Sequence, residues 1–165
     1  MSSSGIVVLS GNPRPGSRTR ALAETVGAAA ADRLGLPAPS VVDVASLGPG
    51  LLDPAAPETA AAVAALRAAH VLVVATPTYK GSYTGVLKVL LDHLPAGGLA
   101  GVRAVPVVTA GVRPQADGAL TLLVQLLREL GASVVKPGLA VAEPDLTPAA
   151  PAGRDFTETV ASLAV

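Results

Sequence analysis

The amino-acid sequence predicts an α/β protein in which a parallel β-sheet is covered by helices on both faces. Short apolar runs rich in Val alternate with longer helix-forming stretches along the whole chain. These runs lack an apolar–polar alternation, which is typical of strands buried on both faces of a parallel sheet. No repeat or linker divides the 165 residues, so a single domain over residues 1–165 is expected.

Five strands and five helices are expected in strict alternation, bounded by Gly, Pro and capping residues. Strands are expected at residues 5–10, 40–45, 71–75, 103–109 and 133–142. Helices are expected at residues 17–34, 58–69, 84–94, 118–130 and 154–163. Loops rich in Gly and Pro fill residues 47–57 and 143–153.

Proline affects two of these strands. Pro106 lies inside the fourth strand and has no N–H group, so the sheet pairing must lapse there locally. Pro137-Gly138 is a potential interruption of the fifth strand. Five strands in this alternation favour the flavodoxin-like order 2-1-3-4-5, in a three-layer α/β sandwich.

That strand order predicts where a ligand binds. The first and third strands flank the point at which the strand order reverses, and ligands bind in the crevice at the carboxyl ends of such strands. Functional residues are therefore expected in three loops, at residues 10–19, 76–83 and 109–117.

Composition argues against several classes of function. Half of the residues are hydrophobic and 15% are charged, which argues against intrinsic disorder. Twelve basic residues balance twelve acidic ones, so there is no general attraction to nucleic acid or to an anionic membrane. Cysteine is absent and only two histidines occur, which excludes thiolate chemistry and leaves little room for a zinc site. Without a signal peptide or membrane-spanning stretch, a cytoplasmic protein is expected.

The first of the three loops opens directly onto a helix. Backbone N–H groups at the helix start, together with the hydroxyl groups of Ser17 and Thr19, would bind a phosphate monoester. Positive charge is supplied by Arg14, Arg18 and Arg20. A simpler interpretation makes Ser17 an ordinary N-cap and the arginines solvated, but the buried strand before this loop favours phosphate binding. The loop lacks both the Lys of a Walker A motif and the GxGxxG pattern of dinucleotide-binding folds.

The second loop holds both tyrosines of the chain. Tyr79 and Tyr83 flank a Gly-Ser turn, an arrangement that suits a flat heteroaromatic ligand; the alternative is that the rings pack against a neighbouring helix or a partner subunit. Lys80 is either a surface lysine or a ligand for a flavin or nicotinamide phosphate. In the third loop, Thr109 and Gly111 would approach the ligand through their backbone.

Two motifs resemble those of one protein family. Residues 10–19 (SGNPRPGSRT) are similar to the G-S-P-R-x-x-S-R-(S/T) phosphate loop of the NADPH-dependent FMN reductases. Residues 75–88 (ATPTYKGSYTGVLK) resemble the P-x-Y-x-x-S-Y-(S/T)-G-x-L-K signature of the same family. The resemblance covers residues 5–142 and is nearest to the alkanesulfonate-type reductases, which feed reduced flavin to monooxygenases. It implies a flavodoxin-like fold, bound FMN, and reduction of flavin by NADPH or NADH.

The resemblance also implies roles for positions in these loops. The FMN phosphate would be held by Asn12, Arg14, Ser17 and Thr19. The isoalloxazine ring would be lined by Pro77, Thr78, Tyr79, Lys80, Gly81 and Ser82. The other side of the ring would be closed by Thr109 and Gly111, with Tyr83 near the ring or at a subunit contact. Ser10 completes the predicted cofactor-binding set, and Asn12 departs from the family's usual serine. No catalytic side chain and no metal ligand is predicted.

Three functions are consistent with the sequence. The first is hydride transfer from C4 of NADPH or NADH to N5 of FMN, supplying reduced flavin to a partner monooxygenase. The second keeps the flavin but delivers electrons to a quinone, an azo dye or a metal oxyanion. The third is a flavin carrier or a non-catalytic FMN-binding subunit of a biosynthetic complex; against the carrier, such proteins usually present an acidic surface and this chain is neutral.

Apolar residues surround most of the predicted helix at residues 118–130, which predicts burial on most of its sides. The members of this apolar perimeter are Leu120, Leu122, Leu123, Val124, Leu126, Leu127 and Leu130. A single domain of this fold would leave such a helix half exposed, so a homodimer or homotetramer is expected.

Overall fold

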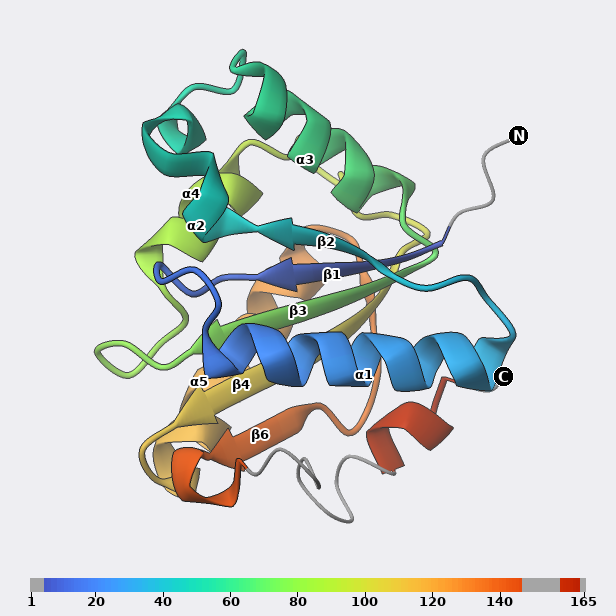
Figure 1. Ribbon diagram of the computed structural model, residues 1–165, viewed down its shortest axis with the longest axis vertical. Helices are drawn as coiled ribbons and strands as arrows, with labels where there is room; N and C mark the ends of the chain where they lie inside the picture. Colours follow the sequence, from blue (N-terminus) through green and yellow to red (C-terminus); the bar gives the residue numbers. More distant parts are fainter. Residues whose placement is uncertain (1–4, 147–157, 164–165) are drawn as a thin grey trace.

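Helices cover both faces of a parallel β-sheet in the computed structural model, which describes residues 5–146 and 158–163 (Figure 1). The strands are β1 (Ile6–Ser10), β2 (Ser40–Asp43), β3 (Val71–Pro77), β4 (Arg103–Ala110), β5 (Ser133–Val134) and β6 (Leu139–Ala142). The helices are α1 (Arg18–Leu34), α2 (Val44–Leu47), α3 (Pro57–Ala68), α4 (Gly85–Asp92) and α5 (Arg113–Glu129), with 3-10 turns η1 (Gly48–Leu52) and η2 (Glu143–Asp145). The sheet runs β2-β1-β3-β4-β5, and β6 also pairs with β4. The predicted order 2-1-3-4-5 is confirmed.

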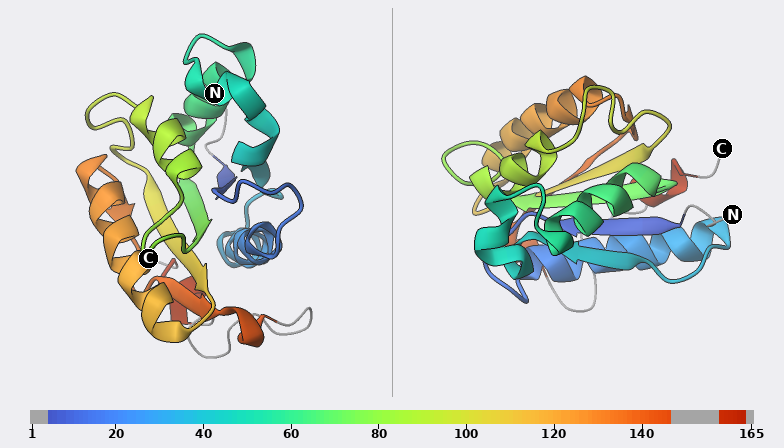
Figure 2. Two further views of the ribbon diagram at one scale, coloured as in Figure 1. Left: turned by 90° about the vertical axis from the view of Figure 1, so that its left-hand side faces the viewer. Right: turned by 90° about the horizontal axis from the view of Figure 1, so that it is seen from above.

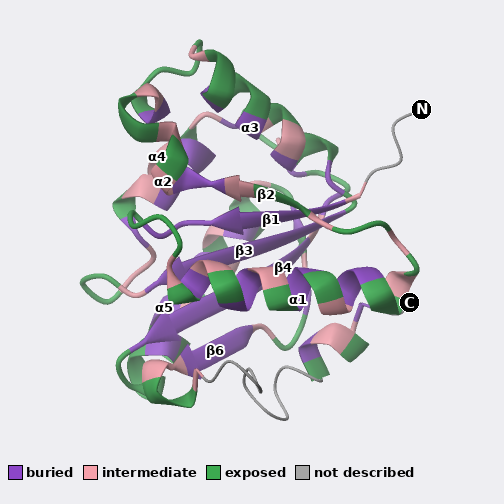
Figure 3. Ribbon diagram, in the orientation of Figure 1, coloured by how far each residue is buried: buried purple, intermediate pink, exposed green. Residues whose placement is uncertain are grey.

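Every residue of β1 and β3 is buried, because both strands have apolar neighbours on the two faces of the sheet (Figure 3). Alternate side chains such as Val8 and Val73 pack on one face beneath α1. Side chains of the other parity, such as Leu9 and Leu72, pack on the opposite face with α3, α4 and α5. Figure 2 shows α1 and α5 on opposite sides of the sheet. This two-sided burial explains the continuous apolar runs in the sequence.

Pro106 lies in the interior of the sheet, and the pairing lapses beside it as predicted. On the β3 side, the register of β4 continues through Pro106 without a break. On the other side, β5 ends opposite Ala104 and β6 begins opposite Val107. The chain between them includes Gly138, where a Cβ would lie 2.9 Å from both Pro106 Cγ and Leu120 Cδ1. The missing N–H of Pro106 and this close approach together interrupt the predicted fifth strand.

The second strand is shorter than predicted, and the loop after it is partly helical. β2 ends at Asp43, whose carboxylate accepts the N–H of Ala45 at 3.1 Å and caps α2. The predicted loop at residues 47–57 contains the 3-10 turn η1. The third strand continues to Pro77 instead of ending at residue 75. Part of the predicted helix at residues 154–163 lies outside the described residues. Within its described part, residues 158–161 are helical.

Helix α5 begins at Arg113 rather than at residue 118, so the second half of the predicted third loop is helical. Pro114 lies in the first turn, where its missing N–H costs no hydrogen bond. Arg113 Nε donates to Asp117 Oδ1 one turn later at 2.8 Å. Gly118 therefore lies inside the helix as an exposed residue instead of starting it.

The apolar perimeter of α5 is used mostly within the chain. Leu123 and Leu127 are completely buried in the core. Three more leucines are partly buried against it, namely Leu120, Leu126 and Leu130. Leu122 is exposed. Packing on the protein's own sheet accounts for most of these residues. The homo-oligomer therefore stays a prediction, and the apolar perimeter of α5 supports it less than its sequence pattern does. No described helix is both long and apolar enough to cross a membrane.

Leu127→Ala should lower the free energy of unfolding by about 2–5 kcal/mol, because it removes a completely buried side chain and leaves a cavity in the core. Leu122→Ala on the same helix is the matched control and should cost less than about 1 kcal/mol, since Leu122 is 40% exposed. Urea denaturation followed by far-ultraviolet circular dichroism measures both values. Equal losses in the two variants would contradict this placement of α5.

Candidate functional site

Two of the loops at the carboxyl edge of the sheet are joined by buried hydrogen bonds. The Thr84 hydroxyl, just before α4, donates to the carbonyl of Gly11 in the loop after β1. The Thr84 N–H donates to Thr76 Oγ1 at 3.1 Å, and the Gly11 N–H donates to the Ala75 carbonyl at 2.7 Å. Glycine is required at position 11, because a Cβ there would lie 2.9 Å from the Cβ of Leu87. Losing one of these bonds would leave a buried polar group unpaired, so the two loops are firmly connected.

A second set of buried contacts fixes the start of α1 to β4. Thr19 Oγ1 lies 3.2 Å from Thr109 Oγ1 and accepts from Asn12 Nδ2 at 3.3 Å. The Thr78 hydroxyl donates to the Thr109 carbonyl at 2.8 Å, which joins the loop after β3 to the same point. Asn12 Oδ1 accepts the N–H of Arg14 at 2.9 Å and so shapes the first loop. These predicted residues are therefore brought together, with much of their hydrogen-bonding capacity used within the fold.

A cavity of about 350 Å³ lies between these loops and the segment after β6. Its volume is in the range of small-molecule sites. The predicted residues that line it are Asn12, Arg14, Ser17, Thr19, Pro77, Tyr79 and Thr109. The remaining lining residues are Pro15, Gly16, Arg18, Glu143 and Leu146. The cavity is thus at the carboxyl edge of the sheet, beside the predicted switch point.

A larger hollow of about 590 Å³ lies at the opposite edge of the sheet, around the start of β1 and the end of α3. Most of the residues that line it are Ala, Gly, Pro, Val and Ile, and Arg67 is the one charged residue among them. This lining offers few polar side chains to orient a ligand. The smaller cavity is therefore the candidate site.

The amino end of α1 lines the candidate cavity and supplies donors for an anion. Ser17 Oγ accepts the N–H of Arg20 at 3.1 Å as the N-cap, and its own O–H remains to donate. Within the described residues, no hydrogen bond uses the N–H groups of Arg18 and Thr19 in the first turn. Arg14 is exposed and forms no ion pair with the described part of the chain. Capping and phosphate binding by Ser17 are compatible, because one uses its oxygen and the other its proton.

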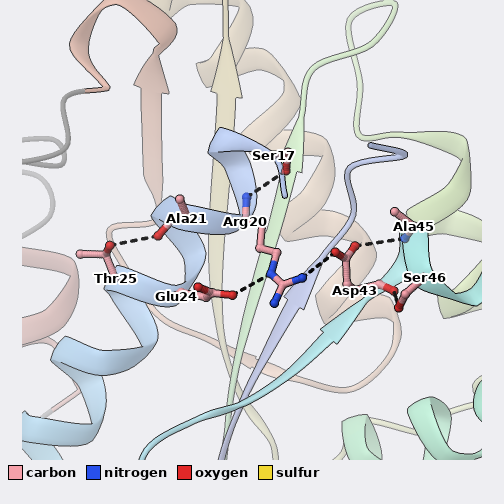
Figure 4. A network of polar contacts seen from close by, with 8 residues as sticks. All are labelled: Ser17, Arg20, Ala21, Glu24, Thr25, Asp43, Ala45 and Ser46. Carbon is pink, nitrogen blue, oxygen red and sulfur yellow. Dashed lines mark hydrogen bonds and ion pairs between the residues drawn. The ribbon is translucent and has the colours of Figure 1, made fainter. Parts of the chain in front are cut away.

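Arg20 does not line the cavity, which corrects the predicted set of three arginines. Its guanidinium is held by two carboxylates, with Nε 2.7 Å from Glu24 Oε1 and Nη1 3.0 Å from Asp43 Oδ2 (Figure 4). The hydrogen bonds to Glu24 and then to Asp43 raise the pKa of Arg20. The Asp43 side chain is only 6% exposed, so Arg20 neutralises a buried charge between α1 and β2. Asp43 therefore has a structural role.

The loop after β3 forms a tight hairpin at its tip. Tyr79 and Ser82 exchange backbone hydrogen bonds of 2.8 and 3.1 Å. Lys80 and Gly81 between them have φ angles of 53° and 79°, as in a type I′ turn. Tyr79 lines the cavity and is 43% exposed. Lys80, Gly81 and Ser82 do not line it, and Tyr83 packs against the core instead.

Ser10 and Gly111 also lie outside the cavity lining. Ser10 is completely buried at the end of β1, and its hydroxyl has no hydrogen-bond partner within the described residues. Gly111 is exposed directly after β4. Neither residue borders the space where the other predicted residues meet, so their predicted ligand contacts find no support in this arrangement.

Glu143 and Leu146 line the cavity although neither is predicted from the sequence. β6 ends at Ala142, at the same carboxyl edge as β1, β3 and β4. The rule that places ligands at the carboxyl ends of strands applies equally to β6, which is the last part of the predicted fifth strand. Glu143 is the residue that follows β6. Glu143 Oε2 lies 3.0 Å from Arg18 Nη2, so an acid and a base of the same cavity are paired.

One of the two histidines, His93, makes a structural contact outside the cavity. His93 Nε2 lies 2.7 Å from the carbonyl of Leu51, which connects the end of α4 with η1. In the described parts of the chain, no three His, Asp or Glu side chains are grouped as a metal site requires. The site therefore rests on the donors at α1 and the surfaces around them.

Comparison with known proteins assigns the family. The family model for NADPH-dependent FMN reductases matches residues 5–145. The chain belongs to the NADPH-dependent FMN reductase family. A solved structure of an NADH:FMN oxidoreductase (EmoB) in its apo form is 32% identical, with a TM-score of 0.86 and coverage of 98% of this chain and 87% of that chain. An oxidoreductase from Corynebacterium diphtheriae is 27% identical, with a TM-score of 0.81 and coverage of 97% and 90%.

Curated relatives of this FMN reductase family member match over shorter segments. The FMN reductase (NADPH) of Escherichia coli strain K12 is 50% identical over 46 residues, which are 28% of this chain and 24% of that protein. The FMN reductase (NADPH) of Pseudomonas putida is 50% identical over 40 residues, 24% of this chain and 20% of that protein. The matched segments thus span about a quarter or less of these relatives. An archaeal flavodoxin, 16% identical with a TM-score of 0.63, shares the fold.

The residues at the cavity fit the FMN that the family name implies. A phosphate monoester requires several N–H or O–H donors and positive charge, which Ser17, Arg14 and the first turn of α1 supply. Pro77 and Tyr79 line the same cavity and offer apolar surface for a flat ring. The donor set and the apolar surface are therefore both compatible with this group.

Arg20→Gln should lower the free energy of unfolding by about 1–3 kcal/mol, because it leaves the buried Asp43 carboxylate without its cationic partner. Arg18→Gln is the matched control and should cost less than about 1 kcal/mol, since its ion pair with Glu143 is largely exposed. Urea denaturation of both variants measures the difference. A larger loss from Arg18→Gln than from Arg20→Gln would overturn the assignment of Arg20 as the structural arginine.

Proposed function

We propose that this protein is an NAD(P)H-dependent FMN reductase, which binds FMN in the cavity at the amino end of α1 and reduces it with NADPH or NADH. One observation carries the proposal. The cavity beside the switch point joins unused N–H and O–H donors to apolar surface, in a chain whose match to the FMN reductase family covers residues 5–145.

The phosphate is held by the chain's own donors in this proposal. The Ser17 hydroxyl and the N–H groups of Arg18 and Thr19 donate to its oxygens, and the positive end of α1 favours its negative charge. Arg14 adds a charge-assisted hydrogen bond from the exposed side of the cavity. Asn12 acts as a positioning residue, because it bonds to Thr19 Oγ1 and to the N–H of Arg14.

The hairpin after β3 positions the flavin ring in the same proposal. Tyr79 offers an exposed aromatic ring, and Pro77 offers a buried apolar surface beside it. The N–H groups of Tyr79 and Ser82 are already used within the hairpin. The N–H groups of Lys80 and Gly81 at the tip lie outside the cavity lining, so they are the donors left for the polar edge of a ring that extends beyond the cavity, where they would stabilise developing negative charge.

The chain contributes position rather than acid–base chemistry. Bound FMN supplies the redox chemistry, because its ring accepts a hydride from a reduced nicotinamide. The rigid contacts at Thr19, Thr84 and Thr109 keep the loops in one geometry, which limits the entropy lost when donor and acceptor meet.

Delivery of reduced FMN to a partner monooxygenase is the finer part of the proposal. It is supported by the resemblance of residues 10–19 and 75–88 to the alkanesulfonate-type reductases, and by the exposure of Arg14 and Tyr79 beside the cavity. Both nicotinamides are retained as donors, because the relatives are described with NADPH in two cases and NADH in one. A homodimer or homotetramer is proposed as well, supported by the exposed Leu122 on α5.

Anaerobic mixing of the FMN-loaded protein with NADPH or NADH should bleach the absorbance of oxidised flavin, because hydride transfer reduces the ring. Rapid-mixing spectrophotometry with each nicotinamide measures the rate. Retention of bound, fully oxidised FMN with both nicotinamides would contradict the reductase and favour a non-catalytic flavin-binding subunit.

A matched pair of variants connects this activity to the cavity. Arg14→Gln should weaken FMN binding about tenfold and leave riboflavin binding unchanged, because it removes one charge-assisted bond to the phosphate. Arg33→Gln, in the last turn of α1 and exposed, should change neither affinity. Fluorescence titration of both flavins provides the comparison.

A further inference from the structure

An acidic side chain lies inside the proposed phosphate site. Glu143 lines the cavity together with Arg14, Ser17 and Arg18. Its Oε2 is 3.0 Å from Arg18 Nη2, so the carboxylate is the present partner of a cation that lies at the start of α1. The side chains of Arg18 and Glu143 are 66% and 44% exposed. An ion pair that exposed contributes little to stability, so stability alone does not account for an acid at this position.

The two partners of this ion pair are held very differently. Glu143 begins η2 directly after β6, and β6 is paired in register with the end of β4. Leu146, just beyond η2, packs against the core beneath α1. These contacts fix the backbone that carries the carboxylate. Arg18 instead carries its charge on a long side chain that is largely exposed.

We propose that Glu143 sets the affinity of the cavity for phosphate, by competing with a bound phosphate ester for Arg18. This inference rests on the proposed function and deepens it. In the absence of ligand, Glu143 is the anion that Arg18 binds. A phosphate held by Ser17 and the first turn of α1 must share Arg18 with Glu143 or take it away, and it then has the carboxylate as a neighbour in the same cavity.

The consequence concerns how long the flavin stays bound. Arg14 and Arg18 bring two positive charges to the cavity and Glu143 removes one, so the attraction for a phosphate dianion is reduced. Since related complexes differ mostly in dissociation rate, the carboxylate should speed the release of FMN. Glu143 thereby favours an exchanging flavin over a permanently held one, which suits delivery of reduced FMN to a separate enzyme. Riboflavin has no phosphate and should be insensitive to the residue.

Glu143→Gln tests the inference and should tighten FMN binding about fivefold, the change expected when one unit charge near the phosphate is removed in a partly exposed site. The dissociation rate should fall by a similar factor, and riboflavin affinity should change less than about twofold. Asp145→Asn is the matched control, because Asp145 lies on the same turn, is exposed, and does not line the cavity. Fluorescence titration and stopped-flow displacement measure both quantities without turnover.

A second pair of variants tests whether the effect acts through Arg18. Glu143→Gln should produce a smaller gain in an Arg18→Gln background, because the competition for Arg18 is absent there and only the direct repulsion between the carboxylate and the phosphate is left to remove. Unchanged or weaker FMN binding by Glu143→Gln would overturn the inference, and so would an equal gain from Asp145→Asn or an undiminished gain without Arg18. None of these results would contradict the proposed function, provided that the unaltered protein binds FMN. Failure of the unaltered protein to bind FMN would overturn both.

Discussion

Buried threonine hydroxyls at the carboxyl edge of the sheet hold the candidate site together. Parallel strands end side by side there, and the loops that leave them carry backbone groups that need partners. Thr84 satisfies the carbonyl of Gly11, and the contact between Thr19 and Thr109 connects α1 to β4 across β3. Because these contacts are buried, they hold the amino end of α1 in one orientation relative to the strands. The anion donors of the first turn depend on that orientation.

The two arginines in the first turn of α1 have different roles, because Arg20 is structural and Arg18 lines the candidate site. Arg18 and Arg20 are two residues apart, a spacing that places side chains on different sides of a helix. Arg20 is held between Glu24 and Asp43 toward β2, whereas Arg18 extends to Glu143 at the cavity. Both Asp43 and Glu143 lie at the carboxyl ends of strands, but their burial differs. A pair that includes the buried Asp43 is costly to break, and the exposed pair with Glu143 is free to exchange partners.

Local pattern predicted most of the fold, because the strands are apolar on both faces and their Gly and Pro boundaries are clear. The start of α5 was missed, since Gly118 resembles a helix boundary more than a helical residue and Pro114 was not recognised as a first-turn proline. The hydroxyl groups of the first loop could be recognised from the sequence. Which groups they bond to depends on how the strands and helices come together in the fold. The contact between the hydroxyl groups of Thr19 and Thr109 joins residues 90 positions apart, so it appears only in the folded chain. Glu143 was missed because functional residues were expected only in the loops after the first, third and fourth strands, whereas Glu143 directly follows β6.

A crystal structure of the protein grown with FMN tests the central claim most directly. The account predicts the phosphate within hydrogen-bond distance of the Ser17 hydroxyl and the N–H groups of Arg18 and Thr19, with the flavin ring beside Tyr79. Density for FMN at another surface, or an ordered FMN whose phosphate contacts none of the first-turn donors of α1, would contradict the account.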